Sequence, residues 1–251
     1  VVDGEKRLLE NHHRNILKGF YSVFKAADAN LQFVLLTGVT KFSQVSVFSG
    51  FNQPEDISMS RDYEALCGIT EEELYSYFAE PIAELAEDND CSVNEMKQML
   101  KKQYDGYHFG KRMTDIYNPF SILNACKSCN IDDYWFRSGT PSYLIRLLNH
   151  TQENLNELTG KYYDTSEFID YKADVEKPLP MIFQSGYLTV KGFDREMNTY
   201  LLDFPNNEVK KGFVTMVAND YLKVKYKAGS WARDIVGALK TGDLEQFRKL
   251  L

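Results

Sequence analysis

The residues that could do chemistry gather directly after a short apolar run near the beginning of the sequence. Residues 33–36 are Phe-Val-Leu-Leu, and Thr37, Thr40, Lys41 and Ser43 follow closely. A short apolar run that ends in a polar residue and a glycine is typical of a strand buried on both faces of a sheet. In open α/β sheets, side chains just past the carboxyl end of such a strand face the ligand crevice, and a lysine beside hydroxyls suits an anion such as phosphate. The pattern indicates an anion site; a buried strand followed by an ordinary polar loop is the alternative.

The elements around this strand raise a question of pairing. Residues 5–27 carry an apolar stripe at helical spacing, so a helix is expected directly before the strand. A strand buried on both faces needs neighbouring strands, yet residues 45–48 could pair at best at a sheet edge. We therefore expect that the partner strands lie upstream and that the chain is a truncated piece. The last predicted helix is still in progress at Leu251, which also indicates that the natural chain continues.

Composition and charge limit the class of protein. The chain has 251 residues, 43% of them hydrophobic, and a formal net charge of −7. This length allows one large domain or two small ones, and the acidic balance argues against broad contact with nucleic acid or membrane. No apolar run approaches the roughly 18 residues of a membrane span, and residues 1–6 do not resemble a signal peptide. We expect a cytoplasmic protein with no membrane partner.

The cysteines fit free thiols better than a disulfide framework or a metal site. There are four of them in a fairly long chain, at positions 67, 91, 126 and 129. Cys126 and Cys129 form a lone C-x-x-C, and zinc would need further ligands that the sequence does not place beside it. The pair also closes a predicted helix, whereas redox use would place it at the start of one.

Residues 61–165 are expected to form a helical region. Thr70 with Glu73 and Ser92 with Glu95 have the spacing of capping boxes, which predicts helices to about residues 87 and 104, with Pro81 kinking or splitting the first. Asn and Thr before the prolines at 119 and 141 predict helices over about 119–128 and 141–149. Residues 104–110 form an aromatic, turn-rich loop that either packs over the core or binds a ligand.

Residues 166–228 are expected to form a winged-helix-like module. A helix or turn ends at residues 180–184, strands are predicted over 186–190 and 199–203 around a turn at 194–198, and a helix over about 208–222. Lysines at 210, 211, 223, 225 and 227 could contact nucleic acid in such a module, although lysines also favour the last turn of a solvated helix. In residues 229–251, Ser230 is expected to cap a helix, Thr241-Gly242 to break it and Asp243 to start another, as a helical linker toward an absent C-terminal domain.

Familiar catalytic signatures are absent or weak. The sequence contains no G-x-x-x-x-G-K-[ST], G-x-S-x-G, H-E-x-x-H or G-x-G-x-x-G. Glu95-x-Lys97 and Asp170-x-Lys172 match the letters of a metal-dependent nuclease motif, which belongs on a strand. The first lies in a predicted helix and the second in a polar segment. The four histidines have no partner at metal-ligand spacing, so no metal site is predicted.

Several blocks in series resemble one known family. They are 33–43 (FVLLTGVTKFS), 47–49 (VFS), 56–58 (DIS), 63–68 (YEALCG), 104–107 (YDGY), 117–121 (YNPFS), 134–136 (YWF) with 138–141 (SGTP), and 184–189 (QSGYLT). In this order they look like the AAA-ATPase-like family common in gut Bacteroidetes and other anaerobes. In that family a P-loop and a magnesium-binding acidic motif precede this region, and a nuclease-like domain of the PD-(D/E)XK class commonly follows it. The resemblance therefore agrees with a truncated chain.

The resemblance implies roles for three residues. Residues 33–36 would be the AAA-type sensor strand, Thr37 the polar residue near the γ-phosphate and the attacking water, and Lys41 or Arg61 a stabiliser of charge. ATP and Mg²⁺ would be cofactors of the intact bacterial protein, while none is expected for this fragment, which lacks the P-loop and is not expected to be catalytically competent alone.

The expected fold is mixed α/β and mostly helical. It would comprise a remnant of a P-loop AAA-type sheet in residues 1–60, then the helical region and the winged-helix-like module. The expected function of the intact protein is nucleotide-dependent regulation or nucleic-acid processing. The alternative is a non-catalytic module that binds protein or nucleic acid through the winged-helix-like part.

Overall fold

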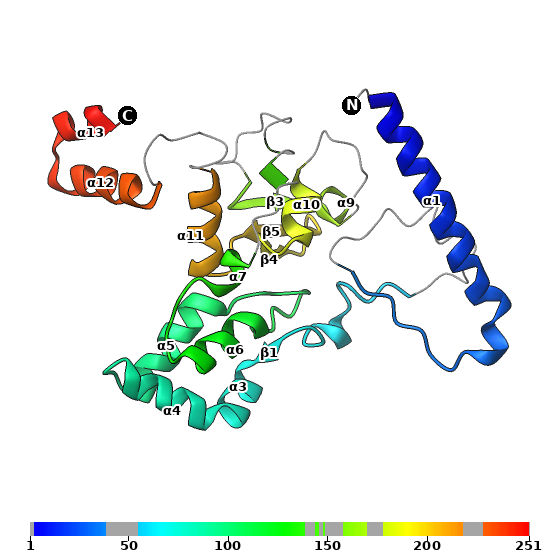
Figure 1. Ribbon diagram of the computed structural model, residues 1–251, viewed down its shortest axis with the longest axis horizontal. Coiled ribbons are helices and arrows are strands. Elements are labelled where there is room, and N and C mark those ends of the chain that lie inside the picture. The colour runs from blue at the N-terminus through cyan, green and yellow to red at the C-terminus, as the bar shows by residue number, and fades with distance from the viewer. Residues whose placement is uncertain are drawn as a thin grey trace.

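The computed structural model describes residues 3–38, 55–138, 144, 145, 148, 158–169, 178–217 and 228–250. The chain is mixed α/β and mostly helical, with two small antiparallel sheets among the described residues, as the sequence predicts at this coarse level. Figure 1 shows a central group of helices and strands, with α1 on one side and α12 and α13 on the other. No described helix has both the length and the apolar character needed to pass through a bilayer.

The first helix carries an apolar stripe that the described residues cover only in part. α1 spans Asp3–Ala26, close to the predicted 5–27, and the short 3-10 helix η1 (Asp28–Asn30) follows it. Several of its apolar side chains are exposed, among them Leu9, Ile16, Phe20 and Val23, whereas others are partly buried. In Figure 1, α1 (blue) stands apart from the central group.

Residues 33–36, predicted as a strand, do not form one within the described chain. The segment adopts no regular secondary structure, and its side chains face solvent, with Phe33 78% and Leu35 54% exposed. A strand exists only where a neighbour supplies its ladder of hydrogen bonds, and no described segment pairs with these residues. Residues 45–48, the weak edge candidate, lie outside the described residues.

Local helix-start signals produce the helical layer. α3 (Glu71–Tyr77), α5 (Val93–Tyr104) and α6 (Pro119–Ser128) begin at their predicted caps, and both capping boxes form. The expected split near Pro81 is also present, because Phe78 separates the end of α3 from the start of α4 (Ala79–Asp88). These helices bury one core cluster: Leu74, Ile82, Leu85, Ala86, Met96, Leu100, Tyr104, Tyr117, Ile122 and Ala125.

A short antiparallel pair of strands, each of two residues, accompanies the helical layer. β1 (Ile69–Thr70) pairs antiparallel with β2 (Ile116–Tyr117), and Tyr107 bridges to Ile116. The short 3-10 helix η2 (Arg61–Tyr63) precedes β1, and α7 (Tyr134–Arg137) follows α6. Of the helix predicted at 141–149, only residues 144, 145 and 148 are described.

The second sheet differs from a simple hairpin. β5 (Thr199–Asp203) is as predicted and lies between β4 (Thr189–Asp194) and β3 (Lys161–Tyr163), all antiparallel. The sequence did not predict β3, and β4 begins three residues after the predicted start because Gly186, at φ +82, belongs to the turn after α10. α9 (Thr165–Phe168), α10 (Leu179–Gln184) and α11 (Asn207–Met216) flank the sheet. The winged-helix description stays a prediction.

The C-terminal pair of helices corrects one predicted cap. α12 spans Ala228–Thr241, so Ser230 lies inside the helix and does not start it. The break at Gly242 is confirmed, with φ +70, and α13 (Leu244–Leu250) follows. The Asp243 side chain accepts a hydrogen bond from the Gln246 amide at 2.9 Å, as a helix cap does.

A buried carboxylate joins α11 to α6 and α7. Glu208 in α11 is fully buried, and its Oε2 accepts a hydrogen bond from Ser121 Oγ in α6 at 2.7 Å. Its Oε1 accepts from the Trp135 amide in α7 at 2.6 Å. Burial raises the pKa of Glu208, and the hydrogen bonds from Ser121 and the α7 backbone oppose that shift. One side chain therefore fixes α6, α7 and α11 relative to one another.

Candidate functional site

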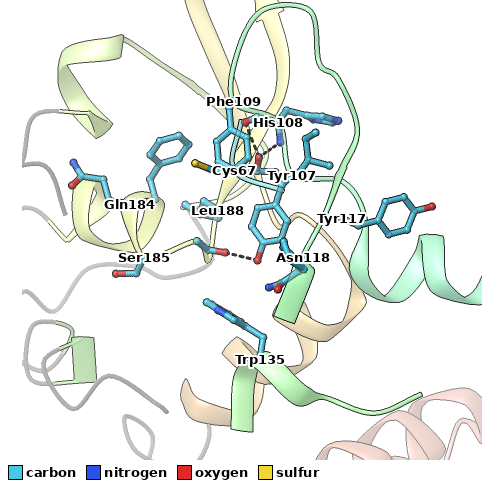
Figure 2. A pocket seen from close by; sticks show the side chains of 15 residues that line it. Cys67, Tyr107, His108, Phe109, Tyr117, Asn118, Trp135, Gln184, Ser185 and Leu188 are labelled. Atoms are coloured by element: carbon cyan, nitrogen blue, oxygen red, sulfur yellow. Dashed lines mark hydrogen bonds between the residues drawn. The ribbon is translucent and has the colours of Figure 1, made fainter. Parts of the chain in front are cut away.

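The sequence blocks that carry the family resemblance meet around one pocket. Its volume is about 300 Å³. It is lined by Cys67 and by Tyr107, His108, Phe109, Ile116, Tyr117, Asn118, Pro119, Trp135, Phe183, Gln184, Ser185, Gly186, Leu188 and Thr189. Figure 2 shows Trp135 on one side of this aromatic pocket and Cys67 with Phe109 on the other. Five of the blocks thus converge on a single site although they are far apart in sequence.

Hydrogen bonds between the blocks hold this pocket in shape. Tyr107 Oη donates to the Gly186 carbonyl at 3.1 Å, as Figure 2 shows. The His108 amide donates to Thr189 Oγ1 at 2.8 Å, and Thr189 Oγ1 donates back to the His108 carbonyl at 3.1 Å. The loop after α5 is therefore tied at two points to the chain that enters β4.

A buried acid positions the far end of the same loop. Glu64, 4% exposed, accepts hydrogen bonds from the Arg112 amide at 3.1 Å and from Thr114 Oγ1 at 3.0 Å. A methyl group at Gly110 would overlap the Glu64 carboxylate, so glycine is needed for the close approach. The block at 63–68 therefore serves to fix the turn between the loop and β2.

His108 has both ring nitrogens occupied. Nδ1 lies 2.6 Å from the Val190 carbonyl, and Nε2 lies 2.7 Å from Asp115 Oδ1. Because both partners are acceptors, the two hydrogen bonds form together only when the ring is protonated. Burial opposes ionisation of Asp115, but His108 and Lys101 outweigh it and hold the pKa of Asp115 below its ordinary value. Both ring nitrogens of His108 are thus engaged by protein groups, and the ring is not placed to act as a base for Cys67.

A second cavity, which the residue 104–107 loop lines with Asp105 and Gly106, is strongly charged. Its volume is about 390 Å³, and it is lined by Lys101, Lys102, Asp105, Gly106, Asp115, Lys191, Asp203, Phe204, Pro205, Asn206, Asn207 and Lys210. Lys101 Nζ is its best-connected cation, at 3.0 Å from Glu71 Oε1, 3.4 Å from Asp115 Oδ2 and 3.7 Å from Asp105 Oδ2. The hydrogen bond to Glu71 is the main cause of the raised pKa of Lys101, so this ammonium stays charged.

One buried and one partly buried ionisable group in this charged cavity have perturbed pKa values. Asp105 is 3% exposed, and burial raises its pKa. Lys191 is partly buried, and burial lowers its pKa. Its Nζ donates to the Gly106 carbonyl at 2.7 Å and to the Pro205 carbonyl at 3.0 Å. Shifted pKa values in a cavity are typical of functional sites as well as of structural ion pairs.

The described residues to which the resemblance gives a role in ATP chemistry, Thr37 and Arg61, do not line either cavity. Among the described residues, no group of three or more His, Cys, Asp or Glu side chains could hold a metal ion. Thr37 is exposed in the extended segment after η1, and Arg61 is exposed in η2, which leads into β1. Lys41 lies outside the described residues.

The other residues considered in the sequence have structural roles or lie outside the described part. Glu95 completes a capping box, and Lys97 Nζ lies 4.2 Å from the centre of the Tyr75 ring, as on an ordinary helix surface. Lys211 pairs with Asp133 at 2.5 Å, whereas Lys210 lines the charged cavity. The cysteines are free thiols, as predicted. Residues 170–172 and 223–227 are not described.

Sequence reasoning missed the charged cavity. Asp105 and Gly106 lie within a quoted block, but Lys191 and Asn206 come from β4 and from the cap of α11. The only available signal was the Asp-Gly pair in an aromatic loop, which by itself indicates a turn. The side chains that surround Asp105 come from positions far along the chain, so no local spacing could reveal them.

Comparison with known proteins places this architecture in a family. Residues 3–48 match the family model AAA-ATPase_like, described as "Predicted AAA-ATPase". The chain is 33% identical over 215 residues to the "Uncharacterized protein in vnfD 5'region" of Azotobacter chroococcum mcd 1; the match covers 85% of this chain and 38% of that protein. No solved structure matches it significantly. The blocks quoted above and the match at residues 3–48 agree, and the chain belongs to the AAA-ATPase-like family.

Proposed function

We propose that the protein acts as an ATP-dependent regulator or nucleic-acid-processing ATPase, and that residues 33–36 are a strand of its nucleotide-binding sheet. The observation that carries the proposal is the exposure of this apolar segment: Leu31 is 38%, Phe33 78%, Leu35 54% and Leu36 38% exposed. Full burial of each such side chain stabilises by about 1.5–3 kcal/mol. A segment this apolar, lying inside the stretch that matches the family model, fits a place between parallel strands.

The proposal assigns the chemistry to residues that the described part does not bring together. The P-loop and the acidic magnesium ligand would come from elsewhere in the protein, since the sequence lacks the P-loop motif and the described residues offer no metal site. Thr37 would stand at the tip of the docked strand, facing the γ-phosphate. Lys41 or Arg61 would stabilise charge there. Apart from Arg61, residues 55–217 would be a non-catalytic part that responds to the nucleotide state.

ATP titration separates this proposal from its alternative. Binding of a fluorescent ATP analogue with Mg²⁺ is measured for residues 1–251 and for the full-length protein. We expect saturable binding only in the longer protein. In that protein, Thr37→Ala is expected to lower hydrolysis at least tenfold while binding persists, with Thr37→Ser as the control that keeps the hydroxyl. Saturable binding by residues 1–251, or unchanged hydrolysis in Thr37→Ala, would contradict the proposal.

The second candidate function is a non-catalytic interaction module. It is favoured by the convergence of five sequence blocks on the aromatic pocket of Figure 2, because aromatic walls with a few polar groups are typical of binding sites. If the module binds nucleic acid through the lysines of residues 210–227, DNA affinity should depend strongly on salt and weaken when Lys210 and Lys223 are changed to alanine. DNA affinity that is unchanged by these substitutions would remove that version of the hypothesis.

A further inference from the structure

The aromatic pocket of Figure 2 is lined almost entirely by uncharged groups. Among the described residues that line it, none is Lys, Arg, Asp or Glu. His108 lines it as well, but its ring nitrogens are engaged by the Val190 carbonyl and by Asp115. A charged group that entered the pocket would lose its hydration and find no ion-pair partner there. The group that the pocket suits is therefore uncharged.

The walls and the size of the pocket favour a single ring. Trp135, Tyr107 and Phe109 contribute aromatic walls, as Figure 2 shows. Two of these walls are held in place, because Tyr107 Oη donates to the Gly186 carbonyl and the Trp135 amide donates to Glu208. Aromatic rings pack well against one another edge to face or with an offset. The volume of about 300 Å³ is at the lower end of the range for ligand sites, so it suits one aromatic side chain better than a whole nucleotide.

Exposed apolar side chains flank the residues of the pocket. Leu66 and Phe120 are the sequence neighbours of Cys67 and Pro119, which line it, and they are 55% and 46% exposed. Leu123, about one turn further along α6, is 53% exposed. A small free molecule in the pocket would leave these side chains in water. A partner protein that inserts one aromatic side chain would cover them with the residues on either side of that anchor.

The helices beside the pocket carry negative charge on their exposed surface. Between Arg61 and Lys97 the sequence contains no Lys or Arg. The exposed acids of this stretch include Asp62, Glu72, Glu80 and Glu84. α3 contacts the pocket wall, because Tyr75 Oη lies 3.4 Å from the hydroxyl of Tyr117, which lines the pocket. An acidic surface of this kind attracts a basic partner and disfavours an acidic one.

From this combination we infer that the aromatic pocket anchors one Phe, Tyr or Trp side chain of a partner protein whose neighbouring residues are basic. The ring enters against Trp135, and the partner backbone crosses Leu66 and Phe120. Its Lys or Arg side chains face Asp62 and Glu72, which lie five residues on either side of Cys67. An aromatic anchor in a pocket is typical of the few residues that dominate a protein interface. The inference rests on the second candidate function, the interaction module, and states the chemistry of its partner.

The experiment follows the indole N–H of Trp135 by NMR. Residues 1–251 are labelled with ¹⁵N at tryptophan, and the Trp135 signal is assigned by its loss in Trp135→Phe. The first ligand is the basic peptide acetyl-Lys-Gly-Phe-Gly-Lys-amide. Three matched ligands are the same peptide with Ala for Phe, the same peptide with Glu for both Lys, and N-acetylphenylalaninamide. We expect saturable shifts with the basic aromatic peptide, at an affinity at least tenfold higher than for the other three. Added NaCl should narrow the difference between the basic and the acidic peptide.

A variant at the edge of the pocket tests where the ring binds without breaking the fold. Cys67 is exposed, so Cys67→Phe is expected to fold, and its ring should compete with the ring of the peptide. We expect the affinity for the basic peptide to fall by about tenfold or more. Asn130→Phe adds the same ring at an exposed position that lines neither cavity, and it should leave the affinity unchanged. Equal affinities in the two variants would overturn the inference.

A second pair of variants tests the charge of the partner. Asp62→Asn combined with Glu72→Gln should weaken binding of the basic peptide several-fold and leave binding of N-acetylphenylalaninamide unchanged. Asp234→Asn combined with Glu245→Gln removes two exposed acids from α12 and α13 and is the control.

The ligand series separates failure of this inference from failure of the interaction module. If the acidic peptide or N-acetylphenylalaninamide binds as tightly as the basic peptide, the inference is overturned, but the pocket remains a binding site. If none of the four ligands shifts the Trp135 signal, the inference and the module at this pocket both fail. No outcome depends on ATP binding.

Discussion

Ser121 in α6 and Glu208 in α11 form a buried hydrogen bond of 2.7 Å that connects the helical layer to the helix behind the three-stranded sheet. Ser121 belongs to the block at 117–121, and Glu208 also holds the amide of Trp135 from the block at 134–136. Two of the blocks that line the aromatic pocket are therefore anchored to one carboxylate. The shape of the pocket depends on an acid that does not line it.

Removal of the Glu208 carboxylate should weaken the connection between α6, α7 and α11. Glu208→Ala leaves Ser121 Oγ and the Trp135 amide buried and unpaired and creates a cavity, so we expect a loss of about 3 kcal/mol in the free energy of unfolding. Glu208→Gln keeps both hydrogen bonds with one donor reversed and should change stability by about 1 kcal/mol or less. Urea unfolding of the two variants checks this. Equal losses of stability in the two variants would show that the charge of Glu208, and not its hydrogen bonds, holds α6, α7 and α11 together.

Prediction from sequence succeeded where the signal was local. α6 occupies residues 119–128 as predicted because Asn118 accepts from the amides of Phe120 and Ser121, and the first helical residue is proline. β3 was missed because Lys161, Tyr162 and Tyr163 have no buried alternation to reveal a strand. It exists because β5 offers it an edge. Such pairing depends on tertiary structure that local spacing does not encode.

The difference between local signals and tertiary contacts also explains the errors in the predicted candidate site. The apolar character of residues 33–36 is a correct observation, but a strand also needs a partner, and the described chain supplies none to it. The charged cavity was missed for the opposite reason, since Asp105, Lys191 and Asn206 are unremarkable where each stands in the sequence. Only the contacts of Lys191 with two distant carbonyls bring them together.

The two hydrogen bonds that Lys191 Nζ donates to the Gly106 and Pro205 carbonyls should contribute strongly to stability. Lys191→Met keeps much of the side-chain volume but leaves the carbonyls of Gly106 and Pro205 without their donor, so we expect a loss of about 2 kcal/mol. Lys127→Met on the surface of α6 is the matched control and should change stability by about 0.5 kcal/mol or less. Thermal unfolding measures both. A change at Lys191 as small as at Lys127 would show that the two carbonyls do not need this ammonium.

Asp105 should make stability fall as pH rises. Burial raises its pKa in the folded state above the ordinary 3.8, so the folded protein binds this proton more tightly than the unfolded chain. The stabilisation is fully present below the ordinary pKa and is lost as pH rises through the folded pKa. Asp105→Asn removes the ionisation, and its melting temperature relative to the wild type should therefore increase between the two pKa values and then stay constant. The exposed Asp90→Asn is the control, and an equal pH profile in both variants would refute the prediction.

Substitution of Gly212 tests how tightly α11 packs against α7. A methyl group there would overlap the ring of Phe136, whereas one at Gly237 in α12 would meet no atom within 4 Å. In an open helix, glycine to alanine stabilises by about 0.5–1 kcal/mol, because alanine loses less backbone entropy on folding. We therefore expect Gly237→Ala to raise the melting temperature and Gly212→Ala to lower stability by about 1–3 kcal/mol through overpacking. Phe136→Leu in the Gly212→Ala background should recover part of the loss, because the smaller side chain makes room for the methyl group. A stabilising Gly212→Ala would mean that α7 can move away from α11 without cost. The connection of the two helices through Glu208 would then be weaker than its hydrogen bonds indicate.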